Sequence, residues 1–303
     1  MKKVLILYYS QSGQLQNVLD NLIAPMQQDS NISCDYKAIK PKFPFPYPWK
    51  FYDFFDVFPE SVYLNGCEVQ EIDCEEEYDL IILGYTVWFL SPCLPVTGFL
   101  QSSQAKKLFK DKPIITVNAC RDMWLTAQEK TKTLLSNLDA RLIDNVVLTD
   151  QGKSIHSFIT TPRWMLTGKK DAFWLFPKAG VAKNEIERAS RFGERLCVAL
   201  AEDLEKKKEP LLKNLGAVNV VGKLIATERI AHRSFLIWTK LIKKAGPPKS
   251  LGRKIVITIY TFFLLALVLT IVPINIIIRK LLYPFRKKQI TKAINYYEAP
   301  SGS

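Results

Sequence analysis

The chain lacks the motifs that identify the commonest nucleotide- and metal-binding proteins. It contains no G-x-G-x-x-G segment, and the segment Gly152-Lys153-Ser154 lacks the earlier glycine that a P-loop needs. Its six cysteines include no C-x-x-C pair, and they show no metal-ligand spacing with the two histidines. These absences exclude an NAD fingerprint, a Walker motif and a recognisable metal site, and they predict reduced thiols in a cytoplasmic domain.

The start of the chain also lacks the apolar segment of a signal peptide, because its apolar run ends at polar Ser10 after only six residues. No internal repeat or low-complexity tract is present. A chain of 303 residues can bury a large core and still carry an appendage. We therefore expect a globular domain with a further segment attached.

The most informative segment follows the apolar run 4–9 and precedes a helical pattern that begins at Leu15. It consists of Ser10, Gln11, Ser12, Gly13 and Gln14. Backbone N–H groups and hydroxyls at the N-terminus of a helix bind phosphate, although the same residue types also form ordinary turns and N-caps. This loop therefore predicts either a phosphate site or a simple turn.

Two further junctions between a strand and a loop favour the phosphate site. The apolar run 80–84 leads into Thr86, Val87, Trp88 and Phe89, and the run 113–117 leads into Asn118, Ala119, Cys120 and Arg121. Ligands of open α/β sheets bind at the carboxyl ends of the strands, so three such loops on one edge form a single crevice. For Trp88 alone, a place in the core is the alternative.

Together, the three loops resemble the flavodoxin pattern. The resemblance implies flavin mononucleotide (FMN) as the cofactor, with its phosphate on the loop of residues 10–14 and its isoalloxazine ring beside Trp88. The third loop, 118–121, occupies the position of the last flavin-contacting loop. Leu15 departs from the pattern, because flavodoxins usually place a threonine there on the phosphate.

Alternating strands and helices predict an α/β fold with a doubly wound parallel sheet. The flavodoxin resemblance implies that this sheet has five strands in the order 2-1-3-4-5. Expected strands are 4–9, 33–39, 80–84, 114–117 and 145–148, and expected helices are 15–26, 96–107, 125–139 and 183–206. This domain covers residues 1–209 and carries aromatic insertions at 41–66 and 151–180. Alternate prolines in the first insertion predict an extended lid that walls an apolar substrate site or touches a membrane, or else an irregular loop. The second insertion closes the site from the other side.

Charge separates the rest of the chain from this domain. Residues 210–303 contain 16 Lys and Arg but only two acidic residues, whereas the preceding part has 26 basic and 27 acidic residues. Nucleic acid is a poor explanation, because the basic residues flank the uncharged segment 255–278. As a helix, 24 residues reach about 36 Å, beyond the ~30 Å hydrocarbon core of a bilayer. We predict a membrane anchor.

The anchor is expected to consist of a basic amphipathic helical region at 210–254, the apolar segment 255–278 and a basic tail at 279–303. Phe235, Trp238, Leu241 and Ile242 recur at helical spacing, as in a helix that lies among lipid headgroups; docking on the flavin domain is the alternative. Six basic residues flank each side of the apolar segment, so charge does not decide its topology. Pro273 and Asn275 suit a kinked or re-entrant segment with both flanks in the cytoplasm, and a simple single span is the alternative. The expected location is the inner membrane, with the flavin domain in the cytoplasm.

A narrower resemblance extends over most of the chain. The chain is similar to the flavodoxin-like dialkylresorcinol condensing enzymes of the DarA type, on the segments 8–14, 87–88, 118–124, 148–152 and 160–164. This resemblance implies an FMN-dependent aromatase that acts after a ketosynthase. Its hydrophobic substrate, a cyclohexanedione carboxylic acid with two alkyl chains, would become a dialkylresorcinol by oxidation and loss of the carboxyl group.

Site roles follow from loop position. Arg121 is the candidate for binding the substrate carboxylate or stabilising the reduced flavin, with a surface ion pair as the alternative. Asp150 and His156, just after the last strand, are candidate proton acceptors or turn residues. A membrane-tethered NAD(P)H:quinone reductase and a non-catalytic flavodoxin-type electron carrier are the competing functions. The oligomeric state stays open, a homo-oligomer included.

Overall fold

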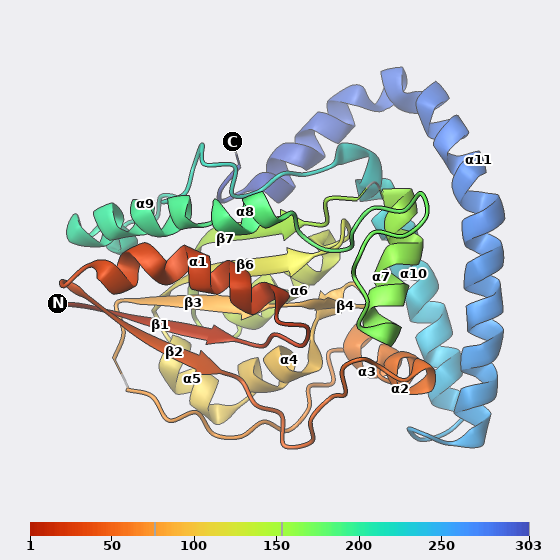
Figure 1. The fold of residues 1–303 in the computed structure, drawn as a ribbon, viewed down its shortest axis with the longest axis horizontal. Coiled ribbons are helices and arrows are strands. Elements are labelled where there is room, and N and C mark those ends of the chain that lie inside the picture. Colours follow the sequence, from red (N-terminus) through yellow and green to blue (C-terminus); the bar gives the residue numbers. More distant parts are fainter. Residues whose placement is uncertain (76, 153, 303) are drawn as a thin grey trace.

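The computed structural model describes residues 1–75, 77–152 and 154–302. Its centre is a sheet of five strands, β1 (Lys2–Tyr8), β2 (Ile32–Ala38), β3 (Leu80–Tyr85), β6 (Pro113–Cys120) and β7 (Arg141–Thr149). The strands pair in the order β2-β1-β3-β6-β7, and every pair is parallel (Figure 1). The predicted α/β sheet is confirmed, because β6 and β7 are the fourth and fifth strands of the predicted order.

Helices cover both faces of this sheet (Figure 1). One core contains α1 (Gln14–Gln28) and α9 (Ser190–Ala201), with the short α8 (Lys183–Glu187) beside them; the other contains α4 (Leu94–Leu100), α5 (Ser103–Phe109) and α6 (Leu125–Ser136). Successive side chains of a strand point to opposite faces. Accordingly, Val4 and Ile6 of β1 lie in the first core, and Leu5 and Leu7 lie in the second.

Two of the predicted helices are divided in the structure. The expected helix 96–107 is interrupted where the Ser102 hydroxyl accepts a hydrogen bond from the Ala105 N–H at 3.1 Å and caps α5. The expected helix 183–206 becomes α8, α9 and the 3₁₀ turn η1 (Leu204–Lys206), which begins after Asp203 at φ 56°. The single-helix predictions were wrong at these positions, because a side-chain cap at Ser102 and a left-handed residue at Asp203 interrupt the helical periodicity.

The insertions contain more helix than predicted. Residues 41–50 are non-helical, as the prolines require, but α2 (Phe51–Asp56) and α3 (Phe58–Val62) follow directly, so the extended lid ends earlier than expected. The second insertion forms α7 (Ser154–Thr167), which lies on the same side of the molecule as α2, α3 and α10 (Figure 1). The antiparallel pair β4 (Val87–Trp88) and β5 (Ser91–Pro92) follows β3.

The C-terminal part forms two long helices, α10 (Gly222–Lys244) and α11 (Leu251–Glu298), which run side by side (Figure 1). Of the two alternatives for the apolar face of α10, the structure shows docking for three of its four residues, whereas Leu241 is 46% exposed. Phe235 packs edge-on against Phe58 at 4.8 Å, Trp238 contacts Tyr260 at 5.2 Å, and Ile242 is fully buried. The face is docked because α3 and α11 offer it apolar partners. Pro273 and Asn275 lie within α11, and their side chains are outside the described residues.

Candidate functional site

A cavity of about 160 Å³ lies at the carboxyl ends of β1, β3 and β6. Predicted residues from all three loops line it, together with Asp150: Gln11, Ser12, Gln14, Leu15, Thr86, Val87, Trp88, Phe89, Ala119, Cys120 and Arg121. In the strand order 2-1-3-4-5, ligands bind at this point, because the strand order reverses between β1 and β3. The sheet therefore brings the three loops together as the sequence predicts.

The first loop ends in the N-terminus of α1. Gly13 is the N-cap at φ 78°, a left-handed conformation that favours glycine. The Ser10 hydroxyl accepts a hydrogen bond from the Gln16 N–H at 3.3 Å, so Ser10 caps the helix and is not a lining residue. The first N–H groups of a helix have no intrahelical partner and attract anions. The loop thus offers backbone donors beside the cavity.

Two glutamines of this loop hold the walls in place. The Gln11 side chain donates to the Pro46 carbonyl at 2.9 Å and accepts from the Trp49 indole at 2.9 Å, which fixes the first insertion. The Gln14 side-chain oxygen accepts from the Val181 N–H at 2.8 Å. It approaches Gly180 so closely that a Cβ there would lie 2.3 Å away. These glutamines shape the cavity more than they supply free donors to a ligand.

Trp88 forms the aromatic wall of the second loop. It is 5% exposed and packs edge-on against Tyr9, Phe45 and Trp49, with ring centroids 5.1–5.9 Å apart. Phe89 and Leu90 follow in the left-handed region at φ 48° and 58°. Two consecutive non-glycine residues in this region cost free energy, and such strain is concentrated at functional sites. The strained turn places Phe89 against the cavity.

Arg121 is the one cationic side chain among the residues that line this cavity. Its Nε and Nη2 atoms are buried and have no hydrogen-bond partner among the described residues, and its Cζ lies 4.1 Å from the centre of the Phe158 ring. Burial lowers the pKa of Arg121 in spite of the nearby Asp122 and Asp150. The Thr161 hydroxyl, from α7, is also buried there without a partner in the described chain. Because buried polar groups are nearly always hydrogen-bonded, these atoms point to a missing polar ligand.

The other predicted reactive groups are differently placed. Asp150 accepts from the Gly152 N–H at 2.7 Å and from the Gly180 N–H at 2.6 Å, and burial raises its pKa. Both carboxylate oxygens therefore hold loops together. His156 lies on α7, with its ring 5.9 Å from the ring of Phe176, and it does not line the cavity. The predicted cofactor-binding residues Ser10, Gly13 and Asn118 are also not among the lining residues. Cys120 lines the cavity, and burial raises the pKa of its thiol.

Several lining residues come from the two insertions that the sequence predicted to wall and close the site, although none of them was predicted individually as a site residue: Phe54 of α2, Thr161, Trp164 and Met165 of α7, and Gly180. A further unpredicted residue, Glu228 of α10, is 1% exposed and accepts from the Leu125 and Thr126 N–H groups at 3.3 and 2.5 Å. A carboxylate stabilises the N-terminus of a helix. Glu228 thereby attaches α10 to the start of α6, directly after the loop that carries Arg121.

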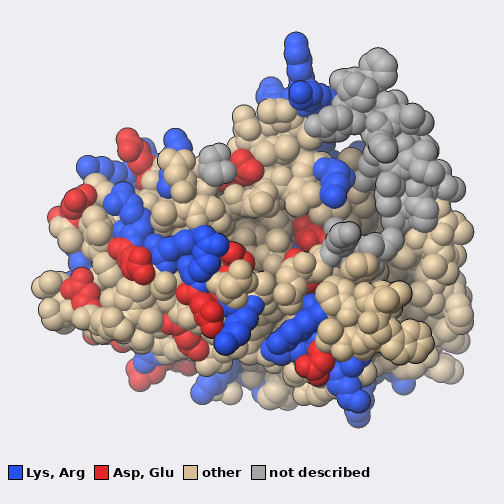
Figure 2. Space-filling model, turned by 45° about the horizontal axis from the view of Figure 1, so that its top comes forward, with Lys and Arg blue, Asp and Glu red and all other residues tan. Residues whose placement is uncertain are grey.

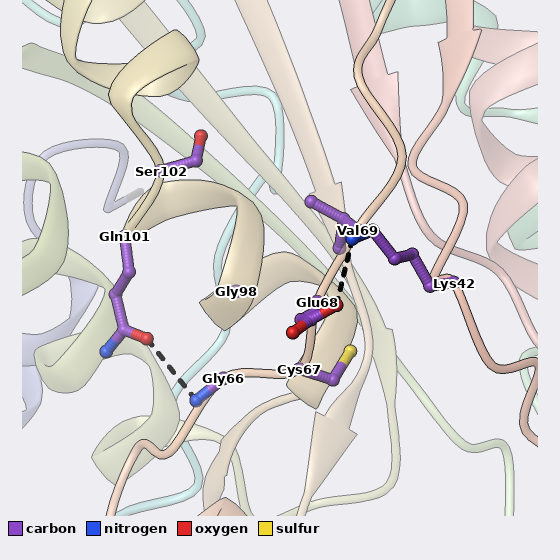
Figure 3. A pocket seen from close by; sticks show the side chains of 8 residues that line it. All are labelled: Lys42, Gly66, Cys67, Glu68, Val69, Gly98, Gln101 and Ser102. Carbon is purple, nitrogen blue, oxygen red and sulfur yellow. Dashed lines mark hydrogen bonds and ion pairs between the residues drawn. The ribbon is translucent and has the colours of Figure 1, made fainter.

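A larger open hollow of about 330 Å³ lies elsewhere, between residues 66–69 and the end of α4 (Figure 3). Lys42 and Glu68 form an ion pair at 2.9 Å across it, and the Gln101 side chain accepts from the Gly66 N–H at 3.3 Å. The polar side chains named here are already paired. We therefore take the smaller cavity at the strand ends as the candidate site.

Comparison with known proteins gives structural similarity only. No protein-family profile and no curated protein matches the chain. Among solved structures, a flavoprotein from Lactobacillus acidophilus in complex with FMN is 21% identical and covers 48% of this chain and 93% of its own, with a TM-score of 0.39. An archaeal flavodoxin is 10% identical; the match covers 67% of this chain and 99% of the flavodoxin, with a TM-score of 0.37. Oxidised flavodoxin 1 from Bacillus cereus is 16% identical; the match covers 64% of this chain and 95% of the flavodoxin, with a TM-score of 0.34.

Proposed function

We propose that the chain is a flavoprotein oxidoreductase that binds FMN in the cavity at the strand ends. The observation that carries this proposal is that buried polar atoms of Arg121 and Thr161 have no hydrogen-bond partner among the described residues, at the switch point of a sheet in the flavodoxin-like order. A ligand with several polar atoms would satisfy them.

The residues present fit FMN in kind. The N-terminus of α1 and the Ser12 hydroxyl suit a phosphate dianion, and Trp88 and Trp164, which both line the cavity, suit an aromatic ring. The volume of about 160 Å³ is below the ~300–1,000 Å³ of typical ligand pockets. FMN binding therefore requires the side chains of α7 to move outward. When bound, FMN would supply a two-electron acceptor.

The surroundings of the cavity favour an apolar substrate. Phe89 lines the cavity, and its ring also lies 4.9 Å from Phe54 and 4.8 Å from Phe58. Phe58 in turn stacks on Tyr260 of α11 at 5.1 Å. An unbroken chain of aromatic contacts therefore connects the cavity to the long C-terminal helix. We infer that alkyl chains of the substrate reach the flavin along this path.

We propose, on the resemblance to DarA-type enzymes, that the reaction is aromatisation of a cyclohexanedione carboxylic acid with two alkyl chains. The ring loses two electrons, two protons and CO₂ to become a dialkylresorcinol. Arg121 binds the substrate carboxylate, since its buried Nε and Nη2 donors, which have no partner among the described residues, would form strong charge-assisted hydrogen bonds with a carboxylate. Asp150 positions the loop that carries Gly180.

The cellular setting follows from the substrate. A ketosynthase that joins two fatty-acid-derived chains would supply it, and a product with two alkyl chains partitions into a membrane. Leu251–Thr270 is long and apolar enough to cross a membrane. We propose that this part of α11 attaches the chain to the inner membrane, with the flavin domain in the cytoplasm.

The decisive experiment is an absorbance spectrum of the detergent-purified full chain with FMN, followed anaerobically. Bleaching of the flavin by a dialkylcyclohexanedione carboxylic acid, without bleaching by NAD(P)H, supports the aromatase. Bleaching by NAD(P)H alone identifies a quinone reductase. A bound flavin that neither compound reduces leaves an electron carrier, and failure to bind FMN refutes the proposed function as a whole.

A further inference from the structure

Helix α11 is attached to the same domain at both ends. At its start, Arg253 is 1% exposed and pairs with Asp56 at 2.8 Å and with Glu60 at 2.5 Å, on α2 and α3. Ile257 and Tyr260 are buried in the cluster that contains Phe58. Moving the start of α11 into lipid would leave the two partly buried carboxylates of Asp56 and Glu60 without their cation. The start of α11 is therefore part of the globular domain.

The end of α11 returns to the opposite part of that domain, beside β7 (Figure 1). The Tyr296 hydroxyl donates to Glu129 of α6 at 2.9 Å, and the fully buried Ser301 hydroxyl accepts from the Asn145 N–H of β7 at 3.3 Å. Ile294 and Tyr297 pack against the core that contains α1 and α9. This end is thus joined to the flavin domain by side-chain packing and by hydrogen bonds to two different elements.

These attachments leave too little helix for a passage through a bilayer and back. Leu264 still packs on the first attachment, and Ile290 lies against Gly222 at the start of α10. About 25 residues separate these two points, whereas crossing a ~30 Å hydrocarbon core twice takes about 40 helical residues. A single crossing would place the tail on the far side, away from Asn145 and Glu129. Both arrangements conflict with the observed packing.

The outer face of α11 is nevertheless apolar and uncovered. Ile255, Ile259, Phe262, Leu265 and Leu269 recur every three or four residues and are 53–75% exposed. Exposed cations lie beyond both ends of this stripe, at Lys249 and Lys254 and again at 286–288. Figure 2 shows charged side chains of both signs over the left part of the visible face, whereas the described residues at the lower right margin, below the grey atoms, are largely uncharged. An apolar stripe between two basic groups matches the interface of an anionic leaflet.

We propose that α11 is a monotopic anchor, whose outer stripe of residues 255–269 lies in the cytoplasmic leaflet while both of its ends stay on the side of the flavin domain. This inference rests on the proposed membrane attachment and is independent of FMN. It places the buried aromatic contacts that run from Tyr260 through Phe58 to Phe89 on the inner side of a helix whose outer stripe lies in lipid.

The first test asks on which side of the membrane the tail lies. Two single-cysteine substitutions are compared: Lys207→Cys, at the exposed end of the flavin domain, and Lys288→Cys, after the apolar stripe. Each variant is treated with a membrane-impermeant PEG-maleimide in intact and in permeabilised spheroplasts. The wild-type chain gives the background labelling of the native thiols. We expect the two cysteines to behave alike and to be modified only after permeabilisation. Modification of Lys288→Cys alone in intact spheroplasts would show a spanning helix and overturn the proposal.

The second test asks whether the stripe binds lipid. The full chain is floated with vesicles of phosphatidylcholine and phosphatidylglycerol, and Leu269→Lys is compared with Val198→Lys, which places the same charge at a 48% exposed apolar position on α9. We expect Leu269→Lys to weaken flotation at least about tenfold and Val198→Lys to leave it unchanged. Equal flotation of the two variants, or none for the wild type, would refute a lipid-binding stripe. Circular dichroism and FMN absorbance of each variant show separately whether the flavin domain is intact.

Discussion

Replacement of Arg121 by methionine should change stability and ligand binding in opposite directions. In the ligand-free chain, Nε and Nη2 of Arg121 are buried without acceptors in the described structure, and each such donor costs about 1–3 kcal/mol. The cation–π contact with the Phe158 ring, 4.1 Å from Cζ, offsets this cost by about 0.5–2 kcal/mol. The pKa of Arg121 is lowered, so the cost of burying the charge exceeds the attraction of Asp122 and Asp150. Arg121→Met should stabilise the ligand-free chain by about 1 kcal/mol.

The same substitution removes the cation that we assign to the substrate carboxylate. Charge-assisted hydrogen bonds contribute about 1.5–3 kcal/mol, so the substrate concentration for half-maximal flavin reduction should rise roughly 10- to 100-fold. Urea unfolding of the ligand-free chain, followed by circular dichroism, measures the first effect. Anaerobic stopped-flow reduction of the FMN-loaded chain measures the second.

Arg163→Met is the matched control. Arg163 also lies over an aromatic ring, 4.3 Å from the centre of Phe173, but it donates to the carbonyls of Lys169 and Asp171 at 3.1 and 3.0 Å, and it does not line the cavity. This variant should be slightly less stable than the wild type and should reduce flavin normally. If Arg121→Met lost stability as Arg163→Met does, or kept the wild-type substrate dependence, the reasoning from unpartnered donors would be refuted.

Three further predictions concern the walls of the site and its surroundings. Gly180→Ala should weaken FMN binding, because Gly180 has φ 93° and an added Cβ would lie 2.3 Å from the Gln14 side-chain oxygen. The control is Gly216→Ala, at φ 65° in open space, which should lose a similar backbone free energy of about 1 kcal/mol. A fluorescence titration should show normal FMN binding for this control. Burial lowers the pKa of Lys130 to about 8, so the unfolded chain binds more protons between pH 8 and 10.5. The unfolding free energy of the wild type relative to Lys130→Met should therefore rise with pH over this window, by on the order of 3 kcal/mol, and a flat difference would contradict the assignment. Phe89→Ala should raise the KM of a long-chain substrate about tenfold through lost apolar contact, with little change for a short-chain analogue; equal changes for both would argue against the aromatic path.

Local pattern was sufficient to predict the elements of the sheet. The apolar runs at 4–9, 80–84 and 113–117 are buried strands, and parallel pairing brings their following loops to one edge, whatever the details of the helices. The prediction of three loops around one cavity follows from that geometry alone. Boundaries were less certain where a cap interrupts a periodic segment, as at Ser102.

Side-chain partners could not be read in the same way, because they depend on segments far apart in the chain. The apolar face that contains Phe235 and Trp238 is equally suited to lipid and to protein, and only the nearby faces of α3 and α11 decide for protein. Asp150 is a typical catalytic residue in sequence, yet Gly180, 30 residues later, occupies one of its oxygens.

By itself, the sequence determined the α/β class, the loops that follow the buried strands and the presence of a long apolar helix, since each is a property of local hydrophobic period and chain order, whereas the strand order came from the flavodoxin resemblance. The tertiary structure decided which polar atoms of Arg121 lack partners, that α7 covers the cavity, and that both ends of α11 attach to one domain. These features arise from packing between distant segments, where apolar area and hydrogen-bonding geometry select one pairing among many that the sequence permits.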